Sequence, residues 1–139
     1  MAGEKEFRVT IMTPERMLFE GDADFLEMTA GEGEIGIYRG HAPTSCILIP
    51  GALRIYRGKA EKTAAVHGGF AEILQEEVRI LAETAEWPEE IDVGRARKAK
   101  ARAEKRLEEK KPETDLPRAE AAFRRALIRL ETAERIVGG

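Results

Sequence analysis

The sequence EWPEE at residues 86–90 separates two stretches of very different composition. Residues 7–85 consist of short apolar and polar runs broken by glycine and proline, whereas residues 91–137 contain almost only alanine, leucine, arginine, lysine and glutamate. Pro88 cannot donate a hydrogen bond to a strand ladder, but it suits the first turn of a helix. We therefore predict a β domain at residues 1–87 and a helical domain at residues 88–139.

The N-terminal stretch shows strand signals about every ten residues. Phe7, Val9 and Ile11 alternate with polar residues, so this segment should have one buried and one wet face. Residues 46–49, Cys-Ile-Leu-Ile, form a continuous apolar run that predicts a buried strand. No helix of crossover length separates the segments, which argues against a parallel α/β sheet. The pattern predicts eight to ten short strands in a β sandwich or flattened barrel.

The C-terminal stretch predicts two helices, at residues 92–110 and from about residue 116 to the end, with a breaker between them. Asp92 is expected to cap the first helix. Because about five residues join the helices, we expect an antiparallel hairpin. The apolar stripe of the first helix is mostly alanine, and each buried methyl group contributes only about 0.8 kcal/mol. Ordering the chain costs a comparable amount, so we expect a hairpin with at least two accessible conformations.

Composition excludes several classes of protein. The 139 residues include 35% charged side chains but a net charge of only −3, without the basic excess of a general nucleic-acid-binding protein. The single cysteine, Cys46, excludes an internal disulfide and is expected to be a small buried residue rather than a reactive thiol. No apolar run approaches the roughly 20 residues of a membrane span, and the N-terminus lacks the apolar core of a signal peptide. We expect a soluble protein that meets a membrane only through a partner.

No residue pattern of an enzyme or metal site stands out. Gly31-x-Gly33-x-x-Gly36 has the spacing of a dinucleotide-binding fingerprint, but a short strand rather than a helix should follow it. His41 and His67 have no cysteine or second histidine at the spacing of a metal site, and neither lies in a nucleophile motif. We therefore expect no catalytic residue and no metal ligand.

Arginines recur on one face of each predicted helix, at spacings of seven and four residues. They are Arg95 and Arg102 on the first helix, and Arg118, Arg125 and Arg129 on the second. Guanidinium groups suit phosphate oxygens. The spacing alone leaves two interpretations open: a phosphate-binding cluster near Asp92, or solvated charges paired with neighbouring glutamates.

Four segments closely resemble the ε subunit of F-type ATP synthases. They are GEIGIYRGHAP at residues 33–43, PGALRI at 50–55, GGFAE at 68–72 and LAETAE at 81–86. Their order and separations also match, and the similarity covers essentially the whole chain. The resemblance implies a ten-stranded β sandwich followed by a C-terminal two-helix hairpin. It also implies a non-catalytic subunit of the central stalk, which couples ion-driven rotation to ATP synthesis.

The resemblance further implies partners and a location. The β domain would bind the γ subunit and rest on the ring of membrane c subunits, with Glu34 and His41 at loop positions that match rotor contacts. In some bacterial members the hairpin extends toward the catalytic α and β subunits and inhibits ATP hydrolysis. The chain would lie on the cytoplasmic face of the cell membrane, and the absence of a transit peptide favours a bacterial source. Whether H⁺ or Na⁺ is the coupling ion stays open.

Certain members bind regulatory ATP on the folded hairpin, through an Ile-Asp-x-x-Arg-Ala motif and arginines of the second helix. The matching residues are Ile91, Asp92, Arg95, Ala96, Arg125 and Arg129, with weaker matches at Glu86 and Arg102. Gly94 inside the motif departs from the pattern, because glycine weakens a helix by about 1 kcal/mol relative to alanine. Regulatory ATP is thus the one ligand expected, and no cofactor is required. The alternative function is a free-standing β-sandwich binding module with a helical tail.

Overall fold

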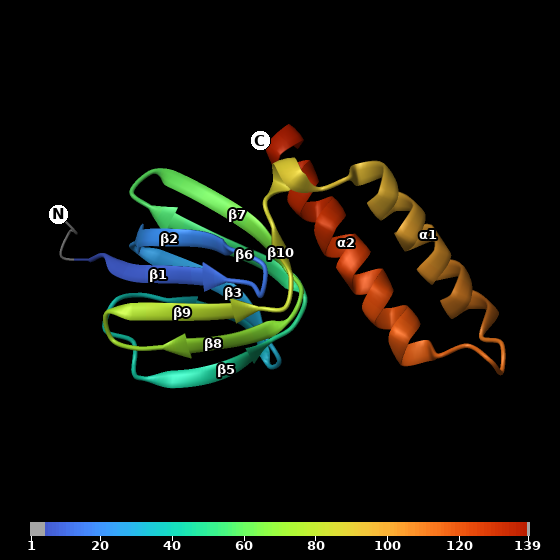
Figure 1. Ribbon diagram of the computed structural model, residues 1–139, viewed down its shortest axis with the longest axis horizontal. Helices are drawn as coiled ribbons and strands as arrows, with labels where there is room; N and C mark the ends of the chain where they lie inside the picture. The colour runs from blue at the N-terminus through green and yellow to red at the C-terminus, as the bar shows by residue number, and fades with distance from the viewer. Residues whose placement is uncertain (1–4, 139) are drawn as a thin grey trace. The chain divides into compact units, whose positions relative to one another are not determined.

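The computed structural model describes residues 5–138, with side chains described through residue 134. The chain divides into two compact units, Met1–Glu86 and Trp87–Gly139. Strands make up the first unit and helices the second (Figure 1). Neither helix in the described part of the chain combines the length and the apolar character needed to cross a bilayer.

Among the described residues of the first unit, ten strands form one sheet. They are β1 (Phe7–Met12), β2 (Met17–Ala23), β3 (Phe25–Ala30), β4 (Gly33–Ile37), β5 (Thr44–Leu48), β6 (Gly51–Arg57), β7 (Ala60–Val66), β8 (Gly69–Ile73), β9 (Glu77–Ala82) and β10 (Ala85–Glu86). The strand order is β10-β7-β6-β3-β5-β8-β9-β1-β2, and β4 pairs with β3. β1 and β9 run parallel, whereas β1 and β2 run antiparallel, as do the neighbouring pairs β5–β8 and β8–β9. The sheet curls into a nearly closed barrel, which confirms the predicted fold class (Figure 1).

Alternate residues of the strands point inward and form the core. Phe7, Val9 and Ile11 are buried, as their alternation predicts. The largest fully buried side chains of this unit are Val9, Ile11, Leu26, Met28, Ile37, Leu53, Ile73, Val78 and Ile80. Full burial of such a side chain contributes about 1.5–3 kcal/mol relative to leaving it exposed. This set therefore holds the β unit together.

The predicted strand at residues 46–49 is confirmed for residues 46–48, which lie in β5, but the prediction that this strand is buried was wrong. In β5 only Leu48 is buried, whereas Ile47 on the opposite face is 70% exposed, and Cys46, which shares the face of Leu48, is half-buried. The pleat sends successive side chains to opposite faces whatever their polarity, so pairing with β8 turns Ile47 outward. Partial burial raises the pKa of the Cys46 thiol, which reduces the thiolate fraction at neutral pH.

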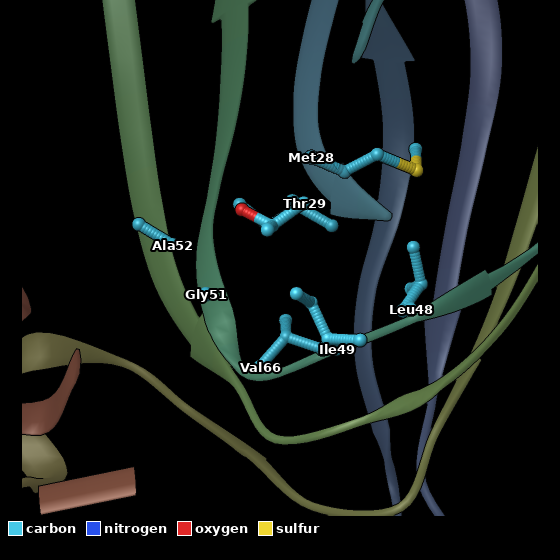
Figure 2. A pocket seen from close by; sticks show the side chains of 8 residues that line it. Met28, Thr29, Leu48, Ile49, Gly51, Ala52 and Val66 are labelled. Atoms are coloured by element: carbon cyan, nitrogen blue, oxygen red, sulfur yellow. The ribbon is translucent and has the colours of Figure 1, made fainter. Parts of the chain in front are cut away.

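Two glycines allow close approaches that a side chain would prevent. Gly51 begins β6, and a Cβ atom there would overlap the side chain of Thr29. Figure 2 shows these two residues in a small hollow, lined mainly by apolar side chains, at one end of the barrel. Gly69 begins β8 with a φ of 136°, and a Cβ atom there would overlap the backbone carbonyl of Leu81. The hollow is a packing feature, because its lining residues leave no room for a water molecule.

The second unit contains a short 3₁₀ turn, η1 (Pro88–Glu90), and two helices, α1 (Val93–Glu109) and α2 (Leu116–Gly138). Asp92 caps α1 as predicted, its Oδ1 accepting a hydrogen bond from the backbone N–H of Arg95 at 3.0 Å. Asp115 caps α2 in the same way, accepting from the N–H of Arg118 at 3.1 Å. The sequence interpretation had assigned Asp115 only to the breaker.

The helices α1 and α2 pack against each other in a folded antiparallel hairpin (Figure 1). The buried apolar residues of the two helices are mainly alanines: Ala96, Ala103, Ala119, Ala126, Leu130 and Ala133. Val137, an apolar residue near the end of the second predicted helix, lies outside the described side chains. The alanine-rich seam is thus confirmed for the described residues, while the ease with which the hairpin opens stays a prediction.

Candidate functional site

The β unit carries a row of five exposed apolar side chains, one on each of five neighbouring strands. Across the sheet they are Ile47 on β5, Phe70 on β8, Leu81 on β9, Met12 on β1 and Met17 on β2. Their exposed fractions range from 37% to 70%. We call this set the apolar row.

The backbone register makes the apolar row continuous. Ile47 lies directly opposite Phe70, and Phe70 lies directly opposite Leu81. Leu81 in turn lies opposite Met12, which lies opposite Met17 across a register shift in β1. Directly opposed residues of neighbouring strands have Cβ atoms about 4.5–5.5 Å apart. The five side chains therefore form one stripe rather than scattered exposed residues, and a contiguous exposed stripe marks an interaction surface.

The next outward-facing positions along the same strands are polar and also lie opposite one another. They are Ser45, Glu72, Arg79, Thr10 and Glu20, which we call the polar row. Arg79 places its Nε 3.1 Å from Oε1 of Glu77, and Arg8 places its Nη2 2.8 Å from Oε1 of Glu20. An apolar stripe bordered by charged side chains has the anatomy of a protein interface, with an apolar centre and a polar rim.

The two residues predicted as rotor contacts lie near β4 and outside the apolar row. Glu34 is exposed on β4, opposite Thr29 of β3. His41 lies in the loop between β4 and β5, half-buried, with Nδ1 2.8 Å from the carbonyl oxygen of Ala42. Their contact role stays a prediction.

The motif predicted to bind ATP runs from the end of η1 into the first turn of α1. Ile91 and Ala96 are buried, whereas Arg95 is exposed. The carboxylate of Asp92 is engaged as the helix cap. Gly94 is the second residue of α1, so it lies in the first helical turn rather than in the helix interior.

The arginines of this predicted site are divided between the helices. Arg102 is exposed on α1, and Arg125 and Arg129 are half-buried on α2. Antiparallel packing places the first turn of α1 beside the C-terminal half of α2, which contains Arg129, and Arg125 lies one turn earlier (Figure 1). Arg118 lies in the first turn of α2, at the opposite end of the hairpin, so it does not join these residues.

Glu86, the remaining residue of the predicted site, lies on β10 in the first unit. Its Oε1 is 3.1 Å from Nε2 of the buried His67. The sequence interpretation had considered His67 only as a metal ligand or as part of a nucleophile motif, and had rejected both roles. Among the described residues, no group of three histidine, cysteine or acidic side chains is arranged to hold a metal ion.

Comparison with known proteins identifies the family. Residues 6–88 match the model of the ATP synthase delta/epsilon chain beta-sandwich domain, and residues 89–134 match that of the delta/epsilon chain long alpha-helix domain. The chain belongs to the epsilon-chain family of ATP synthases. The resemblance read from the sequence is thereby confirmed, and this family forms the epsilon subunit of F-type ATP synthases.

Relatives in the epsilon-chain family match over nearly their full length. The ATP synthase epsilon chain of Halalkalibacterium halodurans is 47% identical, over 91% of this chain and 96% of that protein. That of Caldanaerobacter subterraneus subsp. tengcongensis is 43% identical, over 95% of this chain and 96% of that protein. A chain of the Euglena gracilis mitochondrial ATP synthase structure has the same fold, with a TM-score of 0.69 and 24% identity over 96% of this chain and 80% of that chain.

The apolar row is a surface feature and candidate site that the sequence interpretation missed. A signal for it exists, because four of the five strands carry a consecutive apolar pair that breaks the alternation. The pairs are Ile47-Leu48 in β5, Ile80-Leu81 in β9, Ile11-Met12 in β1 and Met17-Leu18 in β2. One residue of each pair points inward and the other outward. Recognising that the outward members form one row requires the order and register of the strands.

Proposed function

We propose that the chain is a non-catalytic rotor subunit whose β unit docks on the γ subunit of an F-type ATP synthase through the apolar row. The observation that carries the proposal is the register of five exposed apolar side chains across β5, β8, β9, β1 and β2. A stripe of this kind leaves apolar area in water, and a partner that covers it gains about 25 cal/mol per Å² of apolar surface buried. The neighbouring polar row supplies the rim that gives the interface its orientation.

The surroundings of the subunit follow from the family. The Euglena gracilis ATP synthase structure comprises F1 and the c-ring, which supports a place for the fold in the central stalk of such a complex. In this chain, Glu34 and His41 would then contact the rotor next to the ring of c subunits. The protein would reach the cytoplasmic face of the cell membrane only through these partners.

The helical unit is the regulatory part in this proposal. In its folded form, α1 and α2 close on each other along a seam of alanines. An extended form would reach the catalytic α and β subunits and inhibit ATP hydrolysis. Because the seam is thin, the free-energy difference between the two forms is small, and a ligand of modest affinity is enough to shift their populations.

Regulatory ATP is the ligand we propose for the folded form. One observation favours it: the antiparallel hairpin brings the C-terminal half of α2, which contains Arg129, beside the start of α1, where the motif at residues 91–96 lies, and Arg125 lies one turn earlier on α2. Two guanidinium groups next to a helix N-terminus suit a polyphosphate. ATP that binds the folded hairpin more tightly than the extended one would shift the population toward the folded, non-inhibitory form. The equilibrium constant between the two forms can change by no more than the ratio of the two ATP affinities.

The docking proposal is tested by measuring the affinity of the full-length chain for an α₃β₃γ complex. We expect the double substitution Phe70→Ser, Leu81→Ser to weaken binding by at least about 30-fold, because central apolar residues dominate interface energetics. The matched control, Glu72→Ser with Arg79→Ser in the polar row, should weaken binding by less than about tenfold. Unchanged affinity in the apolar variant would exclude the row as the docking surface. If even the unmodified chain fails to bind, the alternative of a free-standing binding module is favoured.

The ATP proposal is tested by calorimetric titration of the full-length chain with ATP. We expect saturable binding that Arg125→Ala weakens by at least about tenfold, because a charge-assisted phosphate contact is lost. Arg118→Ala, at the opposite end of the hairpin, is the control and should leave the affinity unchanged. No heat of binding at millimolar ATP would remove the sensing role and leave the coupling role.

A further inference from the structure

His67 is a buried ionisable side chain that belongs neither to the apolar row nor to the nucleotide motif. It directly follows β7, and its side chain is 1% exposed. Its Nε2 lies 3.1 Å from Oε1 of Glu86, the last residue of β10 and of the first unit. The burial of His67 must be compensated by contacts of its ring, because an imidazole without hydrogen-bond partners is costly to bury.

The contacts of the two ring nitrogens determine which one carries the proton. An ionised carboxylate such as that of Glu86 only accepts hydrogen bonds, so Nε2 must donate. Nδ1 is buried and has no hydrogen-bond partner among the described residues. The neutral ring with its proton on Nε2 satisfies the Glu86 contact and leaves no buried N–H without an acceptor.

His67 also holds the segment before Glu86 through its backbone. Its N–H donates to the carbonyl oxygen of Thr84 at 2.9 Å. The strand β10 has only two residues, which pair with Val66 and Ala65 of β7. So short a strand is anchored weakly by its ladder alone. The backbone of His67 therefore hydrogen-bonds to Thr84, and its side chain contacts Glu86, so His67 holds the chain on both sides of Ala85. The second unit begins directly after Glu86.

We propose that His67 is a positioning residue for Glu86. Through Nε2–H it fixes the direction of the carboxylate and keeps β10 paired with β7. Other charged groups at this point are the carboxylate of Glu83, which packs beside Gly68, and Arg16, whose Nη2 donates to the carbonyl of Ala85 at 3.4 Å. A carboxylate so held accepts from the amino or hydroxyl groups of a nucleotide rather than from its phosphates. This last consequence rests on the proposed binding of ATP, whereas the anchoring of β10 does not.

The ring protonation is tested by nitrogen NMR of the uniformly labelled full-length chain. The chain has two histidines, so His41 is an internal control. His41 places Nδ1 2.8 Å from a carbonyl oxygen and should carry its proton there, whereas His67 should carry its proton on Nε2. Glu86→Ala should abolish the preference of His67 and leave His41 unchanged. A proton on Nδ1 of His67 in the unmodified chain would overturn the proposal.

The anchoring role is tested by amide hydrogen exchange at Ala85 and Glu86. We expect His67→Leu to raise exchange there by at least about tenfold, because the charge-assisted bond is lost, and to leave β9 unchanged. His67→Gln, which keeps a side-chain N–H, should stay within about threefold of the unmodified chain. Glu86→Ala gives the same readout if the leucine variant fails to fold. Exchange rates at Ala85 and Glu86 that are the same in these variants as in the unmodified chain would show that His67 does not hold β10.

Calorimetric titration with ATP separates this proposal from the proposed nucleotide function. His67→Leu and Glu86→Ala should weaken ATP binding by similar factors, and the double substitution should weaken it no further. If ATP binds no variant while the NMR and exchange results hold, the nucleotide function fails and the anchoring role stands. If Glu86→Ala weakens ATP binding but His67→Leu does not, His67 does not position the carboxylate.

Discussion

Leu81 of β9 lies directly opposite Phe70 of β8 on the outer face of the barrel, while its neighbour Ile80 points into the core. Leu81 is 51% exposed and Ile80 is 0% exposed. Two consecutive aliphatic residues of similar size thus have different roles, one in the core and one on the surface. Ile80 contributes to folding, and Leu81 contributes to a surface that is apolar without being needed for folding.

Substitutions of Ile80 and Leu81 should differ strongly in their effect on the free energy of unfolding. We expect Ile80→Ala to lower the free energy of unfolding by about 2–5 kcal/mol, because it leaves a cavity in the core. Leu81→Ala should change it by no more than about 0.5 kcal/mol, because its side chain already contacts water. Urea denaturation followed by circular dichroism measures both. Equal destabilisation would mean that Leu81 is part of the core.

Gly69 should be intolerant of any side chain. Its φ of 136° is unfavourable for other residues, and an added Cβ atom would overlap the carbonyl of Leu81. We expect Gly69→Ala to lower the free energy of unfolding by at least about 2 kcal/mol. Gly31→Ala is the control, since nothing lies near its added Cβ atom, and should change stability by less than about 1 kcal/mol. Thermal and urea unfolding of both variants provide the comparison.

The cap at Asp92 should contribute to the stability of the hairpin and not to that of the β unit. We expect Asp92→Ala to cost about 0.5–2 kcal/mol, because the N–H of Arg95 loses its acceptor. Amide exchange along the first turn of α1 should rise accordingly, while exchange in β1 stays constant. Glu113→Ala, at an exposed position in the inter-helix loop, is the control. Faster exchange in the strands as well would show that the two units unfold together.

The hairpin as a whole should exchange faster than the barrel. The buried apolar residues of α1 and α2 are mainly alanines, whereas the barrel buries isoleucine, leucine, valine and methionine. We expect protection factors at residues 95–134 to lie at least about tenfold below those of β1, β8 and β9. Replacing two seam alanines by larger residues is not a clean control because it overpacks the seam. Leu130→Ala, which thins it further, should lower the protection in both helices.

Tyr56 should make stability fall at alkaline pH. Burial, followed by the hydrogen bond and negative charge of Glu27, raises the pKa of Tyr56 above its ordinary value. The native state then binds a proton that the unfolded state releases once the pH passes about 10, so stability falls as the pH rises through this range. Tyr56→Phe should make the decline shallower, and Glu27→Gln should bring the pKa down. Ultraviolet titration of tyrosinate in a Tyr38→Phe background measures the pKa directly, since the chain has two tyrosines.

Much of the architecture could be predicted because it depends on local patterns. The alternation of Phe7, Val9 and Ile11 predicted the inward face of β1, and Asp92 was recognised as the cap of α1. The alanine stripes predicted the hairpin seam. These features follow from periods of two and 3.6 residues and from cap chemistry, which neighbouring residues determine.

Predictions from the sequence were wrong or incomplete where the direction of a side chain, or its contact partner, depends on segments that are distant in the sequence. Residues 46–49 have the composition of a buried strand, yet pairing with β8 turns Ile47 outward. His67 looked like an isolated histidine, because Glu86 lies 19 positions away in the sequence. Neither outcome can be read from a window of a few residues.

Local residue patterns were enough to predict the β and helical parts, the boundary between them and the family. The pairing of distant strands was needed to show that five apolar side chains from five strands form one row, and that His67 contacts Glu86. This difference arises because a strand's own sequence sets which residues alternate between its two faces. The hydrogen-bond ladder between strands far apart in the chain sets which residues become neighbours.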